Sequence, residues 1–160
     1  MNKIDLTKLT PSAATRGEDE NEAELLKQTF REAEQYLLSF DWCRGVVDSY
    51  LGIGVGGVIG VFLFRIVPSK EDVDEWLWVV AGDVPPAYIT IDCAPNPACA
   101  LDAYIGEMEK WVNAASAGKS VANLIPVNIS ATAENARRLQ TRLDFLDKQI
   151  LSKYSHDLEA

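Results

Sequence analysis

Apolar residues recur every three or four positions across residues 23–40, which is the period of one face of an α-helix. An acid-rich segment, Glu18–Glu24, stands at the beginning of this stretch, where the positive end of a helix dipole favours negative charge. The pattern predicts an amphipathic helix of about five turns, with its apolar stripe in the protein core. A shorter helix is predicted through Trp42–Tyr50, with Ser39 or Asp41 as its cap.

After Gly52, where the short helix should end, the sequence becomes rich in β-branched and aromatic residues. Strands are predicted at Val58–Val67, Glu75–Ala81 and Ala87–Ile91, and an earlier strand near Leu51–Val55 is left open. The second of these runs is apolar on both faces, which is typical of a strand that is central or covered by helices. Turn residues separate the runs, so together they predict an antiparallel meander.

Two more helices are predicted after the sheet. Asn96 and Pro97 supply a cap and a first helical residue for a helix that runs to about Ala115. Thr132 is a suitable cap for the last helix, which has a heptad-like apolar stripe. That stripe consists of Ala136, Leu139, Leu143, Leu146 and Ile150. Because the stripe is short, it favours docking on the domain's own sheet over a dimer zipper.

These elements predict an α+β domain, with an antiparallel sheet of three to four strands, two helices before it and two after it, packed on the sheet. The chain has 160 residues, 48% of them hydrophobic, which is long enough to bury roughly two-thirds of its unfolded surface in one core. We expect a flexible N-terminal segment at residues 1–17, a single domain at 18–154 and a C-terminal tail at 155–160.

The formal net charge of −9 is concentrated in one region. Residues 45–109 hold ten Asp and Glu against Arg65 and Lys70, which is a local net charge of −8. Such a surface repels phosphate, so neither nucleic acid nor an anionic membrane surface is expected as a partner. This negative charge would favour a basic protein as the binding partner. In the alternative interpretation, the acidic residues only keep the protein soluble.

The beginning of the chain, Met1–Thr10, lacks the charged-then-apolar pattern of a signal peptide. The longest apolar run, Val55–Phe64, is broken by glycines and is too short to span a bilayer. We therefore expect a cytoplasmic protein. Its three cysteines, Cys43, Cys93 and Cys99, have no Cys-x-x-Cys spacing and are expected to be reduced thiols.

The motifs for cofactor binding fail on their context. Gly52, Gly54 and Gly57 have the spacing of a dinucleotide fingerprint, but a helix precedes them and a strand follows, the reverse of the required order. The segment 118–120, Gly-Lys-Ser, lacks the earlier glycine of a phosphate-binding loop. His156 is the only histidine, which leaves no base for a Ser-His-Asp or Cys-His site. We expect no cofactor, no metal site and no enzymatic activity.

Carboxylates remain as candidate functional groups. Asp83 and Asp92 lie on neighbouring β segments, which leaves a carboxylate enzyme as an alternative, although an Asp in a turn more commonly bonds the backbone. Other acids precede Trp76 and Trp78 and would pair with basic residues of a partner while an exposed aromatic anchors it. In the competing interpretation both tryptophans are in the core. The predicted partner-binding residues are Glu71, Asp72, Asp74, Glu75 and Asp83.

The stretch Asp74–Tyr88, DEWLWVVAGDVPPAY, and its continuation Ala94–Ala98, APNPA, resemble a family of small uncharacterised bacterial proteins. Small acidic proteins of this kind resemble the immunity proteins of polymorphic or contact-dependent toxin systems. The resemblance implies a protein that neutralises a basic toxin domain by occluding its active site, and it assigns no binding residue. A homo-oligomeric module, for example a homodimer, or an adaptor module that uses the last helix is the alternative function.

Overall fold

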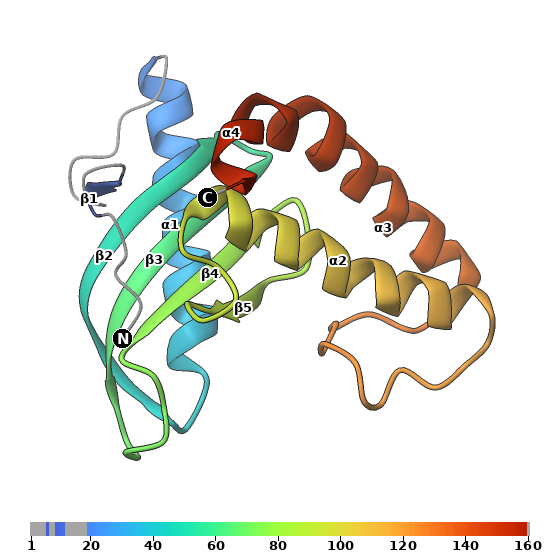
Figure 1. Cartoon of the computed structure of the whole chain (residues 1–160), viewed down its shortest axis with the longest axis horizontal. Helices are drawn as coiled ribbons and strands as arrows, with labels where there is room; N and C mark the ends of the chain where they lie inside the picture. The colour runs from blue at the N-terminus through green and yellow to red at the C-terminus, as the bar shows by residue number, and fades with distance from the viewer. Residues whose placement is uncertain (1–5, 7–8, 12–18, 160) are drawn as a thin grey trace.

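The computed structural model describes residues 6, 9–11 and 19–159. Its strands are β1 (Thr10–Pro11), β2 (Cys43–Val55), β3 (Ile59–Pro68), β4 (Trp76–Gly82) and β5 (Ala87–Thr90). Its helices are α1 (Glu20–Leu38), α2 (Pro97–Ser116), α3 (Ala133–Phe145) and the short α4 (Ser155–Leu158). The strands form one antiparallel sheet in the order β1-β2-β3-β4-β5. Helix α1 covers one face of the sheet and α2 crosses the other (Figure 1).

The antiparallel α+β architecture is confirmed, but in the described residues the sheet has five strands instead of three or four, and one helix instead of two precedes β2. Strands β3, β4 and β5 occupy the three predicted strand regions. The segment predicted as a helix, Trp42–Tyr50, instead belongs largely to β2, which pairs with β3 over its whole length. Three irregularities in that pairing interrupt the two-residue alternation of β2. The apolar positions of this strand therefore imitate the spacing of a helix.

Gly52 does not end a helix but allows α2 to approach the sheet. A Cβ atom at this position would lie 2.4 Å from Cγ of Pro97, the first residue of α2. Any side chain here would therefore push the beginning of α2 away from β2. At the end of β4, Gly82 has a φ of +135°, and a Cβ there would lie 2.5 Å from the carbonyl oxygen of Val58. Glycine is thus required at both positions.

Each face of the sheet has its own apolar cluster. On the α1 face, the fully buried Leu37 clusters with Phe64 and Val79. On the α2 face, the fully buried Trp78 clusters with Tyr104. The interior residues of β4 are buried because helices cover both faces of the sheet, as the two apolar faces of this strand predict.

The last long helix was predicted to pack on the sheet, but it packs on another helix instead. Helix α3 lies along α2, and its stripe residues Ala136, Leu139 and Leu143 are buried in the α2-face cluster (Figure 1). It continues through a π-helical turn, Leu146–Ile150, and a 3-10 turn, Leu151–Tyr154, into α4. None of the described helices is apolar enough over a sufficient length to cross a membrane.

The described parts of both chain ends contact the domain. Strand β1 pairs with β2 next to the buried Leu9, and apart from Leu6 and residues 9–11 the predicted flexible segment, residues 1–17, lies outside the described residues. At the other end, α4 forms most of the segment predicted as a tail. The predicted helix cap Asn96 donates from its side-chain amide to the carbonyl oxygen of Asp157, at 2.9 Å. The two ends of the described chain are thus tied to the sheet and to α2.

Candidate partner-binding site

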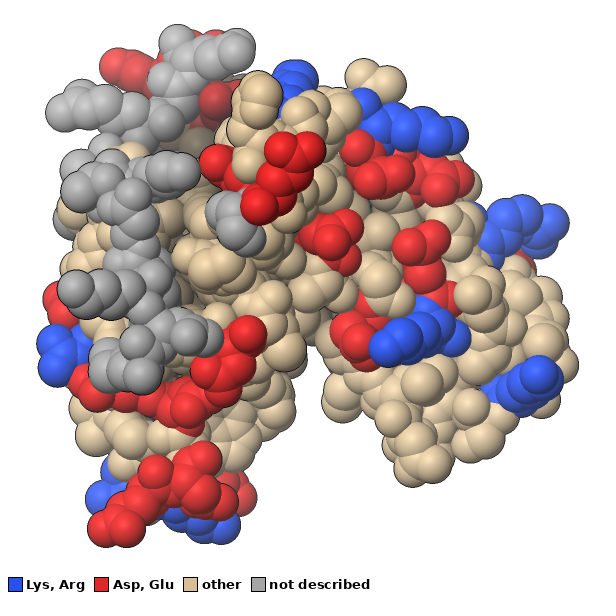
Figure 2. All heavy atoms as spheres, in the orientation of Figure 1, with Lys and Arg blue, Asp and Glu red and all other residues tan. Residues whose placement is uncertain are grey.

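Four of the five predicted binding residues lie together in the loop that joins β3 to β4. This acidic loop, Glu71–Glu75, exposes all four carboxylate side chains. Figure 2 shows Asp and Glu atoms gathered at the lower end of the sheet, where Figure 1 places the loop. Backbone hydrogen bonds hold its base, from Ser69 N–H to Trp42 O (2.9 Å) and from Ile66 N–H to Glu75 O (2.8 Å). The carboxylates therefore project from an anchored loop.

The acids of this loop differ in their ion pairs. Glu75 accepts a hydrogen bond from Nε of Arg65, on the adjacent strand. Among the described residues, Glu71, Asp72 and Asp74 form no ion pair with any Lys or Arg. Three of the predicted residues thus present unneutralised charge to solvent, while the charge of Glu75 is already compensated within the chain.

Asp83 is separated from the acidic loop by the full length of β4, which is roughly 20 Å for its seven residues. The backbone N–H of Asp83 donates to the carbonyl oxygen of Val58 at 3.0 Å. Its carboxylate accepts a hydrogen bond from Nε of Arg142, on α3, at 3.2 Å. The predicted set of five residues therefore falls into two places, and Asp83 belongs to the second.

Neither tryptophan of β4 is an exposed anchor. Trp78 is fully buried, and its indole N–H donates to the carbonyl oxygen of Ala94 at 2.8 Å. Trp76 is half-buried, with its ring centroid 6.2 Å from that of Tyr50 and 5.8 Å from the guanidinium carbon of Arg65. The core interpretation is correct for Trp78, and Trp76 packs within the chain's own surface.

Two other aromatic residues lie beside the acidic loop. The rings of Trp42 and Tyr88 have centroids 5.2 Å apart, and Phe40 stacks on Trp42 at 4.8 Å. Together with Asp72 and Asp74, the rings of Trp42 and Tyr88 border a hollow of about 200 Å³. We term this arrangement the acidic–aromatic site. It is lined by Trp42, Asp72, Val73, Asp74, Leu77, Tyr88 and Thr90.

Sequence reasoning missed both aromatic residues of this site. Trp42 falls at the beginning of the segment predicted as a short helix, Trp42–Tyr50. In the structure it follows the end of α1 and precedes β2, and its own carbonyl holds the acidic loop. Tyr88 is 38% exposed on β5, the edge strand of the sheet. The sequence signal that could have indicated Tyr88 as a binding residue is an aromatic residue in a short strand at the edge of the sheet.

The acidic–aromatic site is suited to binding a cation. Carboxylates attract a basic side chain, and aromatic faces attract a cation held within about 6 Å of the ring. Burial raises the pKa of the adjacent Tyr36 to about 12, so this hydroxyl stays neutral at physiological pH. No group of three or more His, Cys, Asp or Glu within the described part of the chain could hold a metal ion. All three cysteines are free.

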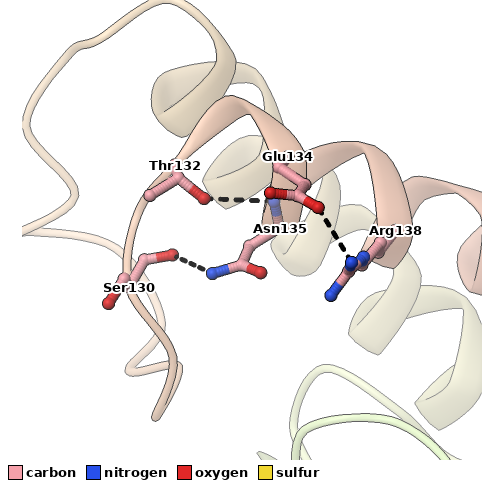
Figure 3. A network of polar contacts seen from close by, with 5 residues as sticks. All are labelled: Ser130, Thr132, Glu134, Asn135 and Arg138. Carbon is pink, nitrogen blue, oxygen red and sulfur yellow. Dashed lines mark hydrogen bonds and ion pairs between the residues drawn. The ribbon is translucent and has the colours of Figure 1, made fainter.

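A larger hollow lies at the opposite end of β4, and sequence reasoning missed it as well. It has a volume of about 440 Å³ between the loop Gly82–Pro86 and α3, from which Asn135, Arg138 and Arg142 line it. Figure 3 shows how the beginning of α3 is fixed, with Asn135 bonded to the residues that precede the helix. The two arginines lie outside the apolar stripe of the predicted helix, and nothing in the sequence indicates which loop faces them.

Comparisons of the chain with protein-family models, curated proteins and solved structures found no match. The function of the protein is therefore inferred from the geometry and charge of the chain itself. Two features of that geometry are candidates for binding, the acidic–aromatic site at one end of β4 and the arginine-lined hollow at the other.

Proposed function

We propose that this protein binds a basic surface of a partner protein through the acidic–aromatic site. The observation that carries the proposal is the position of Asp72 and Asp74, two carboxylates without an ion-pair partner in the described chain, at the rim of a hollow walled by Trp42 and Tyr88. A lysine or arginine side chain of the partner would enter this hollow. Its stem would contact the rings and its charged end would face the carboxylates.

The two parts of the site contribute differently to binding. Exposed carboxylates on a chain of net charge −9 steer a basic partner and raise its association rate, and salt screens this effect. The rings of Trp42 and Tyr88 supply rigid apolar area, the kind of contact that commonly carries most of the binding energy at an interface. The complex should therefore associate more slowly as salt rises, while its dissociation depends mainly on the rings.

We further propose that binding is inhibitory, as expected of an immunity protein that occludes the active site of a basic toxin domain. The resemblance noted in the sequence supports this identity for the partner. An occluding protein needs a fixed, charged surface and no catalytic group of its own. The anchored acidic loop is such a surface, because its base is held by backbone hydrogen bonds to Trp42 and Ile66.

Co-expression tests this function. Production of the chain should restore growth to cells that make the toxin domain encoded beside its gene. The double variant Asp72→Asn/Asp74→Asn should lose protection and slow association by about threefold to tenfold at low salt. The matched control Asp102→Asn/Asp147→Asn removes two exposed carboxylates elsewhere and should still protect. Absence of rescue by the unaltered chain, or equal losses in both double variants, would contradict the proposal.

A further inference from the structure

A groove runs along α3 on the side that faces the loop Gly82–Pro86. Two hollows, of about 440 and 290 Å³, share the residues Asp83, Val84 and Arg142 and are therefore adjoining lobes of one groove. We term it the α3 groove. It extends from Asn135 to Phe145 on the helix, a distance of about 15 Å at 1.5 Å per residue.

Both walls of the α3 groove are held in place by hydrogen bonds outside it. The buried Tyr104 of α2 donates from its hydroxyl to the carbonyl oxygen of Pro85 at 2.6 Å. The backbone bond from Asp83 to Val58 fixes the other end of the same loop. On the opposite wall, Asn135 donates its backbone N–H to Oγ1 of Thr132 and its side-chain amide to the carbonyl oxygen of Ser130 (Figure 3). A groove with fixed walls loses little conformational entropy when a ligand binds.

The α3 groove is the place where two arginines face a hollow of this acidic chain. Its lining holds Arg138 and Arg142 against Asp83, and with Glu134, which pairs with Arg138 beside the groove, the four charges balance on a protein of net charge −9. Arg138 bonds Glu134 through one Nη atom, at 2.8 Å, and Arg142 bonds Asp83 through Nε. Within the described residues, Nη2 of Arg142 and both Nε and Nη1 of Arg138 make no hydrogen bond. These donors match the oxygens of a carboxylate.

Apolar side chains lie on either side of the two arginines. Ile129, 45% exposed, borders one lobe, and Phe145, 48% exposed, borders the other. Val84 and Leu139 line the part between them. These two side chains would give the apolar residues of a bound partner something to pack against.

We propose that the α3 groove binds an acidic peptide segment of a partner protein, with a carboxylate on Arg138 and Arg142 and apolar side chains in the two lobes. The length of about 15 Å matches four or five residues of extended chain, whereas a small anion would fill one lobe only. A polyanion such as nucleic acid is repelled by the net charge of −9. The groove lies at the opposite end of β4 from the acidic–aromatic site, so peptide binding here does not depend on the proposed function.

The ion pair between Asp83 and Arg142 gives peptide binding a distinctive dependence on charge. In the unbound protein, Asp83 occupies the guanidinium that the peptide carboxylate would use. Removing the charge of Asp83 should therefore strengthen peptide binding. If Asp83 only supported the structure of the groove, its substitution would weaken peptide binding instead. The loop itself should persist in Asp83→Asn, because its backbone bond to Val58 does not involve the side chain.

The experiment is a titration of the full, isotopically labelled chain with a capped pentapeptide of alternating leucine and glutamate, followed by NMR. Shifts should map to residues 82–86 and 135–145, and the matched leucine–lysine peptide should cause none there. Arg138→Gln/Arg142→Gln should weaken binding roughly tenfold, and Asp83→Asn should tighten it about threefold. The control Arg31→Gln/Arg44→Gln, which removes two exposed arginines elsewhere, should bind within about twofold of the unaltered chain.

Three results would overturn the proposal. The first is equal binding of the glutamate and lysine peptides, and the second is unchanged or weaker binding by Asp83→Asn. The third is binding of hexanoate as tight as that of the peptide, which would show a site for small organic acids instead. Should Arg138→Gln/Arg142→Gln fail to fold, the expected gain in affinity of Asp83→Asn still decides the question.

Discussion

The hydroxyl of Tyr104 joins α2 to the β4–β5 loop, and its removal tests whether that bond holds the α3 groove. In Tyr104→Phe the ring can remain in the core while the carbonyl oxygen of Pro85 loses its donor at 2.6 Å. A buried hydrogen bond contributes about 0.5–1.5 kcal/mol, and an acceptor left without a partner costs about 1–3 kcal/mol. Because Pro85 is half-buried and water reaches part of it, we expect a loss of about 1–2 kcal/mol in unfolding free energy.

Urea denaturation measures this loss, with a matched control in Tyr50→Phe. The hydroxyl of Tyr50 makes no hydrogen bond in the described chain, so that variant should change stability by less than about 0.5 kcal/mol. For a protein of 160 residues, the loss in Tyr104→Phe corresponds to a Tm lower by about 3–6 °C. Equal stability of the two variants would refute the reasoning, because it would show that water replaces the bond without cost and that the loop is not held by Tyr104.

Three further changes test the fold. Trp78→Phe removes the indole that donates to Ala94, and it should lower the unfolding free energy by about 2–3 kcal/mol in urea denaturation. Gly106→Ala, where an added Cβ meets nothing within 4 Å, should raise the Tm, with a gain of about 0.5–1 kcal/mol, whereas Gly82→Ala should lower it because its φ is +135°. Burial raises the pKa of Tyr104 in the folded state, so the unfolded chain releases this proton first. The contribution of Tyr104 to stability is therefore complete below about pH 10 and should fall above it by about 1.4 kcal/mol per pH unit, so the loss of unfolding free energy between about pH 10 and 11 should be smaller in Tyr104→Phe than in the unaltered chain.

The helices were predictable because their signals are local. A stripe at spacings of three and four residues marks α1, α2 and α3, and the caps Asn96 and Thr132 accept the backbone N–H groups three residues on, as predicted. Both the stripe and the cap depend on residues that are close together in the chain. For these three helices the two signals extend over three turns or more, whereas the shorter segment Trp42–Tyr50 also offered a cap and a helix-like spacing and is nevertheless part of a strand.

Strand β2 and both binding regions depend instead on contacts between distant residues. The irregular pairing of β2 with β3 hides its alternation, so Trp42 was assigned to a helix and its contact with Tyr88 was not expected. The hollow beside Asp83 exists because α3 packs on α2 and brings Arg142 to the β4–β5 loop, 59 residues away in sequence. Periodicity shows that a helix has an apolar face but does not show which surface covers it.

The most direct test of the central claim is an NMR titration of the labelled chain with a hexalysine peptide, repeated on Asp72→Asn/Asp74→Asn and on Asp102→Asn/Asp147→Asn. The claim predicts shifts confined to the acidic loop, the indole N–H of Trp42 and the amide of Tyr88. It also predicts that these shifts disappear in the first variant, persist in the second and weaken as salt rises. Shifts spread evenly over the acidic residues of α1 and α2, with equal losses in both variants, would contradict it.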